Sequence, residues 1–134
     1  MRATARRENG TLKHDVAIRE HMVVADEPEE NGGDDSGPSP QELLAASLAS
    51  CTAITIEMYA DRKGWQLGDV EVAVEFTEAS PDNPASFDVQ VRIPAKLDPD
   101  QHKRILGIVA KCPVHKVLKA GDVEIYDELE LVEA

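Results

Sequence analysis

Residues 37–51 of this chain read GPSPQELLAASLASC and contain a clear helix start. Ser39 can cap the first turn, Pro40 suits the first helical position, and Glu42 completes a capping box with Ser39. No proline or glycine follows until Gly64. We therefore expect one uninterrupted helix up to that glycine, about 35 Å long at 1.5 Å per residue.

The expected helix is apolar or small on nearly all of its faces. One stripe at helical spacing consists of Leu44, Leu48, Cys51, Thr55 and Met58. A helix of this kind is normally buried, so we expect it to be central and covered on all sides. It contains Glu42, Glu57 and a charged end, so we do not expect it to span a membrane.

The composition indicates one soluble domain with an acidic surface. The 134 residues include 26 acidic and 14 basic side chains, which gives a formal net charge of −12. No basic face can be assembled, which argues against binding to nucleic acid or to an anionic membrane. The first ten residues lack the apolar core of a secretory signal, so we expect a cytoplasmic protein.

The remaining segments predict an α+β fold with antiparallel sheets, because strands, a helix, strands, helices and a strand follow one another. Alternating apolar residues indicate the strands. A second helix start lies at 98–101, and Pro113 ends or kinks the helix that follows. We expect a single domain over 1–134, made of N-terminal antiparallel strands (1–25), a loop (26–38), the central helix (39–63), a hairpin (69–94), helices (98–120) and a last strand (122–132).

Two cysteines are the main candidates for chemistry. Cys51 lies on the apolar stripe of the central helix, where a small core residue is the ordinary alternative. Cys112 precedes Pro113 and would cap a short helix, whose N-terminal N–H groups stabilise a thiolate. In a reducing compartment a permanent disulfide is not expected. Both cysteines lie on apolar helix faces that must share one core, so we interpret them as a reactive pair.

Glu42 is a further candidate, and capping is its alternative role. It precedes Cys51 by nine residues and so lies ~13 Å away along the axis, on the opposite face. A catalytic Glu42 would therefore have to act on a second copy of the chain. Cys112 and His115 have the spacing of half a metal site, but too few ligands remain nearby to complete one. We expect no metal, with a metal-holding dimer as a minor alternative.

The two cysteine motifs resemble those of the OsmC/Ohr family of osmotically inducible and organic hydroperoxide resistance proteins. The likeness rests on GPSPxELLAAxxxxC at 37–51 and CPVHK at 112–116, preceded by residues 21–28 and the glycine pair at 32–33. It implies antiparallel sheets wrapped around a long central helix in an intertwined homodimer. It also implies a thiol peroxidase that needs no metal or other cofactor and reduces organic hydroperoxides to alcohols.

The resemblance also implies roles for individual residues. Cys51 corresponds to the peroxidatic cysteine and Cys112 to the resolving cysteine with which it forms a disulfide. An external dithiol of the lipoyl type would reduce that disulfide. The family's glutamate stands ten residues before the peroxidatic cysteine, where this chain has Gln41, whereas Glu42 stands at nine.

Two questions stay open at this point. The arginine that assists Cys51 in the family has no single counterpart here, and Arg7 and Arg19 are the candidates. The alternative function is a non-catalytic dimer that binds a small apolar molecule and leaves its thiols idle.

Overall fold

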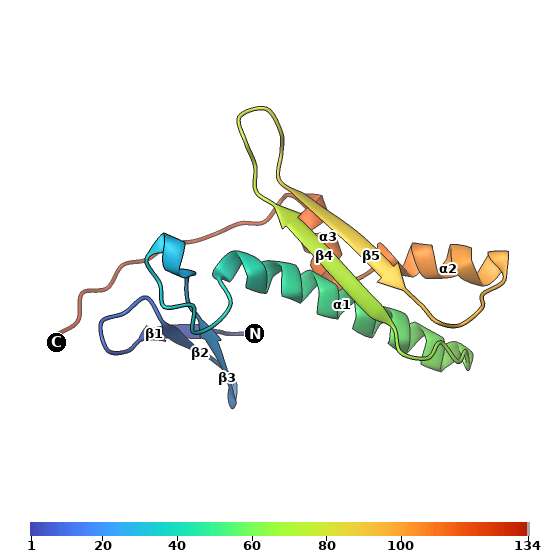
Figure 1. The fold of residues 1–134 in the computed structure, drawn as a ribbon, viewed down its shortest axis with the longest axis horizontal. Coiled ribbons are helices and arrows are strands. Elements are labelled where there is room, and N and C mark those ends of the chain that lie inside the picture. The colour runs from blue at the N-terminus through green and yellow to red at the C-terminus, as the bar shows by residue number, and fades with distance from the viewer. Residues whose placement is uncertain (134) are drawn as a thin grey trace.

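A single long helix runs through the middle of the computed structural model, which describes residues 1–133 (Figure 1). Helix α1 (Pro40–Lys63) begins with the predicted capping box. The Ser39 hydroxyl accepts from the Glu42 N–H at 3.2 Å, and the Glu42 carboxylate accepts from the Ser39 N–H at 2.9 Å. Gly64 ends the helix in the left-handed conformation, at φ 72°. The prediction of this helix is confirmed.

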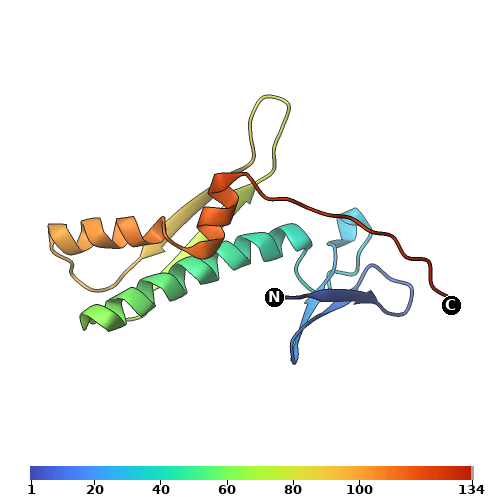
Figure 2. The same cartoon turned by 180° about the vertical axis from the view of Figure 1, so that it is seen from behind.

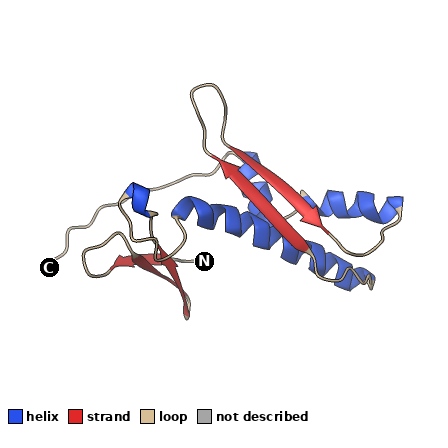
Figure 3. Cartoon of the chain, in the orientation of Figure 1, coloured by secondary structure: helices blue, strands red, loops and turns tan. Residues whose placement is uncertain are grey.

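Three short strands form an antiparallel sheet beyond the N-terminal end of α1 (Figures 1 and 3). They are paired in the order β1 (Thr4–Arg7), β2 (His14–Ile18) and β3 (His21–Ala25). The β1–β2 turn passes through Asn9 and Gly10, which both have positive φ, as an Asn-Gly hairpin signal predicts. Within the described chain both edges of this sheet are unpaired.

A second hairpin packs across one side of α1 (Figure 1). Strands β4 (Glu71–Thr77) and β5 (Ser86–Arg92) alternate strictly between partly buried and exposed residues, as predicted. Phe76 and Phe87 are direct cross-strand partners whose rings stack with centroids 4.6 Å apart. The hairpin therefore turns one apolar face toward α1.

Two helices complete the core next to α1. Helix α2 (Pro99–Val109) begins with a second capping box, made by Asp98 and Gln101. Helix α3 (Pro113–Ala120) follows after a short break and crosses α1 (Figure 2). The most buried apolar cluster joins α1, the segment after it, and α2; its members are Ile56, Ala60, Leu67 and Ile105.

The loop between β3 and α1 is held by one buried carboxylate. Asp26, which is 3% exposed, accepts hydrogen bonds from the N–H groups of Glu27 (2.8 Å) and Ser36 (3.0 Å) and from the Ser36 hydroxyl. A side chain at Gly33 would place its Cβ 1.9 Å from the Glu27 carbonyl oxygen, so only glycine fits there. The short 3-10 turn η1 (Glu29–Asn31) lies within this loop, which fixes how the chain enters α1.

We expect this loop to loosen in acid. The Ser36 hydroxyl and the N–H groups of Ser36 and Glu27 lower the pKa of Asp26 from 3.8 to about 2. A lowered pKa in the folded state stabilises the fold above the unfolded pKa, and the gain is lost as pH falls from 3.8 through about 2. Asp26→Asn should therefore unfold at lower urea than the parent at neutral pH, and this difference should shrink below pH 3. Glu30→Gln, which changes an exposed acid in the same loop, is the control; an equal loss in both variants would contradict the prediction.

Two sequence-based expectations about α1 need correction. The buried stripe is not the predicted one but consists of Leu48, Thr52, Ile56 and Ala60. Nor is the helix covered on all sides, since Leu44, Ile54 and Met58 are 39%, 55% and 56% exposed. The reason is that the hairpin, α2 and α3 of this chain pack against only part of its circumference.

The strand expected over 122–132 is not formed in the described chain. From Gly121 to residue 133 the chain has no regular secondary structure and leads away from α3 past the other elements (Figure 2). Its apolar side chains are nearly all exposed: Val123, Ile125, Tyr126, Leu129, Leu131 and Val132. A β-strand exists only where its N–H and C=O groups find a partner strand, and this segment has none among residues 1–133.

Candidate active site

The crossing of α1 and α3 brings the two cysteines together. Cys51 lies in the middle of α1, and Cys112 is the residue that caps α3. Although they are far apart in the sequence, the two thiols lie within hydrogen-bonding reach of each other, and both are free. The sequence-based expectation of a converging pair agrees with this geometry.

The two sulfurs have different access to solvent. Cys112 is fully buried, with 0% of its surface exposed, whereas Cys51 is partly exposed. A dissolved reagent would therefore meet Cys51 first. Cys51 is therefore the outer thiol of the pair, and Cys112 is the inner one.

The N-terminus of α3 favours a negative charge on the sulfur atoms next to it. Pro113 occupies the first helical position, and Cys112 lies just before it with extended backbone, φ −55° and ψ 129°. The backbone N–H groups of Val114 and His115 act on the sulfurs at this end of the helix. Such unpaired N–H groups favour a thiolate over a thiol.

The two thiols differ in acidity for this reason. Burial raises the pKa of Cys51, and the neighbouring Cys112 raises it further. Burial also raises the pKa of Cys112, but Cys51, the His115 N–H and the nearby Thr52 hydroxyl favour its charged form and outweigh burial, so the net shift is downward. Within a single chain, Cys112 is therefore the thiol that ionises more easily, and the negative charge is favoured on it.

Two hydroxyls beside the sulfurs were not assigned a role from the sequence. Thr52 is fully buried and acts on Cys112, and Thr55 acts on Cys51. The sequence places Thr55 on the same helical stripe as Cys51, since a residue four positions after a helical cysteine lies on its face. Thr52, one position after Cys51, has no such signal.

Glu42 lies in the first turn of α1, away from the thiol pair at the middle of that helix. Its carboxylate is engaged by the backbone N–H and hydroxyl of Ser39, which lower its pKa. The side chain beside it, Gln41, donates to Glu78 at 3.1 Å. Neither residue takes part in the thiol pair of its own chain, and a catalytic Glu42 stays a prediction that requires a second copy.

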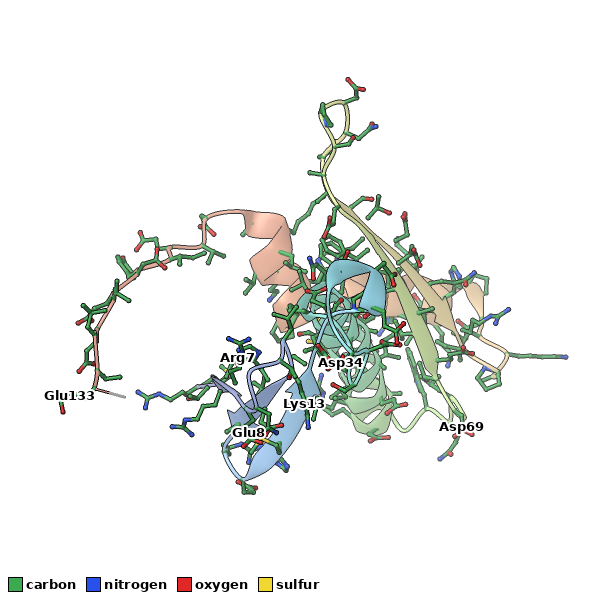
Figure 4. The ribbon with its side chains drawn as sticks, turned by 60° about the vertical axis from the view of Figure 1, so that its left-hand side comes forward. Arg7, Glu8, Lys13, Asp34, Asp69 and Glu133 are labelled. Carbon is green, nitrogen blue, oxygen red and sulfur yellow. The ribbon has the colours of Figure 1, made fainter. Side chains whose placement is uncertain are left out.

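The two candidate arginines are engaged on the N-terminal sheet. The guanidinium of Arg7 donates to the carbonyls of Thr11 and Gly10, both at 2.5 Å, and Figure 4 shows it on that sheet beside Glu8 and Lys13. Arg19 lies 3.7 Å from Glu20 in an exposed ion pair. Neither supplies a cation to the thiols within one chain.

Residues 1–133 contain no group of three or more histidine, cysteine, aspartate or glutamate side chains arranged to hold a metal ion. His115 approaches Cys112 through its backbone N–H.

Comparison with known proteins identifies the family of this chain. The sequence profile of the family described as OsmC-like protein matches residues 33–125, which include both cysteines. The chain belongs to the OsmC-like family. No curated protein matches the sequence. As an OsmC-like protein, it belongs to a family whose members are generally soluble. By length and composition alone α1 could cross a membrane, but the core helices of soluble proteins also meet these two criteria.

Solved structures share the fold of this OsmC-like chain. A protein from Psychrobacter arcticus assigned to the osmotic stress induced and detoxification response is 24% identical, with a TM-score of 0.75 over 86% of this chain and 85% of that one. The OsmC-like protein of Mycoplasma pneumoniae is 19% identical, with a TM-score of 0.74 over 90% and 87%. The organic hydroperoxide resistance protein OhrB of Bacillus subtilis is 18% identical, with a TM-score of 0.58 over 90% and 93%. At these identities the likeness establishes the fold.

Proposed function

We propose that this OsmC-like protein is a thiol-dependent peroxidase that reduces organic hydroperoxides to alcohols, with Cys51 as the peroxidatic and Cys112 as the resolving cysteine. One observation carries the proposal: two free thiols meet at the crossing of α1 and α3, the outer one within reach of solvent and the inner one at a helix N-terminus. Several of the similar structures are named as organic hydroperoxide resistance proteins, which supports the same chemistry.

The reaction would follow from the order of the two sulfurs. The Cys51 thiolate attacks the terminal oxygen of the hydroperoxide, the O–O bond breaks, and the alkoxide leaves and takes up a proton as the alcohol. Cys51 is then a sulfenic acid. The Cys112 thiolate attacks the Cys51 sulfur, forms the disulfide and releases the hydroxyl as water. An external dithiol, for which a lipoyl-type compound is our expectation, returns both cysteines to thiols.

The first step needs a thiolate on Cys51, which a single chain does not favour. A cation beside Cys51 would move the negative charge outward, since an opposite charge a few Å away lowers a thiol pKa. We expect that cation to be an arginine oriented by Glu42 of the partner subunit in a homodimer. The helix end that carries Glu42 cannot reach Cys51 of its own chain, which is why a second copy is required.

Two unpaired apolar surfaces support the homodimer. One is the open side of α1, where Leu44, Ile54 and Met58 are exposed. The other is the segment after α3, whose apolar side chains have no partner in the described chain. Exposed apolar side chains that gather on one element are typical of contact surfaces. A second copy would bury both, because it presents the same helix and the same free sheet edges.

We expect an alkyl hydroperoxide to be preferred over hydrogen peroxide, because an apolar groove adjoins the helices that carry the thiols. The groove, of about 440 Å³, lies between β5 and α3; Leu48, Phe87, Val89 and Leu118 line it together with His115 and Lys119. Burial of an alkyl chain there would be favourable at about 25 cal/mol per Å² of apolar surface. Hydrogen peroxide offers no such surface.

The deciding experiment is intact mass spectrometry of the reduced protein before and after one equivalent of cumene hydroperoxide. We expect a loss of two hydrogens, and peptide mapping should place the new bond between Cys51 and Cys112. Hydrogen peroxide at the same dose, followed by stopped-flow fluorescence of Trp65, should react at least about tenfold more slowly because the apolar contacts are missing. Unchanged mass with the organic hydroperoxide would refute the proposal.

The second candidate is a non-catalytic dimer that binds a small apolar molecule. The upward shift of the Cys51 pKa within one chain favours it, because a neutral thiol is a poor nucleophile. Alkylation of Cys51 by iodoacetamide as a function of pH separates the two. An ordinary thiol pKa in the assembled protein, together with no disulfide after stoichiometric hydroperoxide, would favour binding.

A further inference from the structure

Thr52 presents a buried hydroxyl with no hydrogen-bond partner. Among the side chains that the structure describes, its Oγ1 is the buried polar atom left unsatisfied, and the residue is 0% exposed. A threonine inside a helix ordinarily returns its hydroxyl to the carbonyl four residues earlier. Ser50 does so on the same helix, donating to the Ala46 carbonyl at 2.9 Å. Thr52 does not, so its hydroxyl is available for something else.

The group that this hydroxyl faces is Cys112. Thr52 lies on the side of α1 that packs against the other helices, whereas Ser50 is exposed. Its hydroxyl is close enough to the Cys112 sulfur to favour the charged form of that thiol. The resting thiol is a weak acceptor, but a thiolate would accept the O–H strongly. An unpaired donor is therefore held beside the sulfur on which charge would develop.

We infer that Thr52 is a positioning residue that donates its hydroxyl to the Cys112 thiolate as that thiolate is expelled from the Cys51–Cys112 disulfide, and so directs the external dithiol to Cys51. The inference rests on the proposed disulfide and deepens it. It gives a second reason, besides the difference in exposure between the two cysteines, why the dithiol attacks Cys51 rather than Cys112.

The step balances as an ordinary thiol–disulfide exchange. One thiolate of the dithiol attacks the Cys51 sulfur, a new sulfur–sulfur bond forms, and the Cys51–Cys112 bond breaks. Cys112 leaves with the electron pair, and the Thr52 hydroxyl and the N–H groups at the start of α3 stabilise it. The second thiol of the reagent then attacks the reagent sulfur that is bonded to Cys51 and releases Cys51 as a thiolate. The protein has then gained two electrons, and the dithiol has become a disulfide.

The alternative is that Thr52 only fills space in the core. Thr52→Val tests this, because valine keeps the shape and removes the hydroxyl. Thr52→Ser keeps the hydroxyl and serves as the rescue variant. Ser50→Ala removes a hydroxyl from the same helix that is already bonded to its own backbone, and is the matched control. The disulfide is prepared in each protein with diamide, so that the test does not depend on peroxidase activity.

We expect Thr52→Val to slow reduction of this disulfide by dihydrolipoic acid about tenfold, since a hydrogen bond to a charged group contributes roughly that factor or more. Thr52→Ser should stay within about threefold of the parent, and Ser50→Ala should match it. Trapping of the mixed disulfide should place the reagent on Cys51 in the parent and partly on Cys112 in Thr52→Val.

A second measurement separates this role from a structural one. In a Cys51→Ser background the one thiol that interacts with Cys112 is removed, so absorbance at 240 nm reports ionisation of Cys112 alone, with His115 of α3 as a titratable residue close to it in sequence. Adding Thr52→Val should raise the Cys112 pKa by about one unit, which corresponds to about 1.4 kcal/mol. Reduction at the parent rate and an unchanged titration in Thr52→Val would overturn the inference. If hydroperoxide fails to form the disulfide but these two results hold, the peroxidase proposal fails and the role of Thr52 stands.

Discussion

Cys51→Ser is expected to lower the rate of organic hydroperoxide consumption at least about a thousandfold, because a serine hydroxyl in this setting cannot replace a thiolate nucleophile. Cys112→Ser should behave differently. Its first turnover should proceed at a rate near that of the parent, and the protein should then stop as a Cys51 sulfenic acid, heavier by one oxygen atom. Stopped-flow kinetics in the first turnover and intact mass afterwards distinguish the two variants.

The pair of variants also tests the order of the two sulfurs. Within one chain the negative charge is favoured on Cys112, because Cys51, the His115 N–H and the Thr52 hydroxyl all favour the charged form of that thiol. If Cys112 itself attacked the peroxide, Cys112→Ser would lose the first turnover and Cys51→Ser would retain it. That outcome would reverse the assigned roles. Ser50→Ala, whose hydroxyl is bonded within α1, should leave both measurements unchanged.

The start and end of α1 could be predicted because they depend on local chemistry. The capping box needs only Ser39 and Glu42 at their spacing, and Gly64 ends the helix by its own backbone preference. The meeting of Cys51 and Cys112 was predictable for a similar reason, since Cys51 lies within a helix and Cys112 at the start of another, and the two helices pack in one core. In these cases both interacting residues can be recognised from the sequence around them.

The buried face of α1 could not be predicted in the same way. A helix with small or apolar residues on most faces offers several stripes, and the one that is buried depends on where the hairpin and α2 lie. Thr52 was missed because its unpaired hydroxyl is visible only once Cys112 is placed beside it. The segment 122–132 alternates well enough to suggest a strand, but the partner that a strand needs is not found in the described part of the chain.

The second large expected effect is loss of the dimer when the segment 122–132 is changed. Leu129 and Leu131 are 85% and 88% exposed, and in a strand they would share one face, with Glu128 and Glu130 on the other. Replacing both leucines with serine should convert a dimer into a monomer. Burial of a leucine is worth about 1.5–3 kcal/mol, so four per dimer should weaken association by at least about four orders of magnitude. Light scattering over a concentration series measures this, with Glu128→Ser/Glu130→Ser as the matched control.

The leucine variant also shows what the second copy contributes to the thiols. The Cys51–Cys112 pair lies within one chain, so a monomer should still form the disulfide with diamide. It should nevertheless react slowly with cumene hydroperoxide, because the cation that we expect beside Cys51 would be missing and burial alone raises the pKa of that thiol. A monomer that reacts at the parent rate would show that one chain completes the site. A leucine variant that stays as tightly dimeric as the glutamate control would show instead that the segment after α3 is not the contact surface.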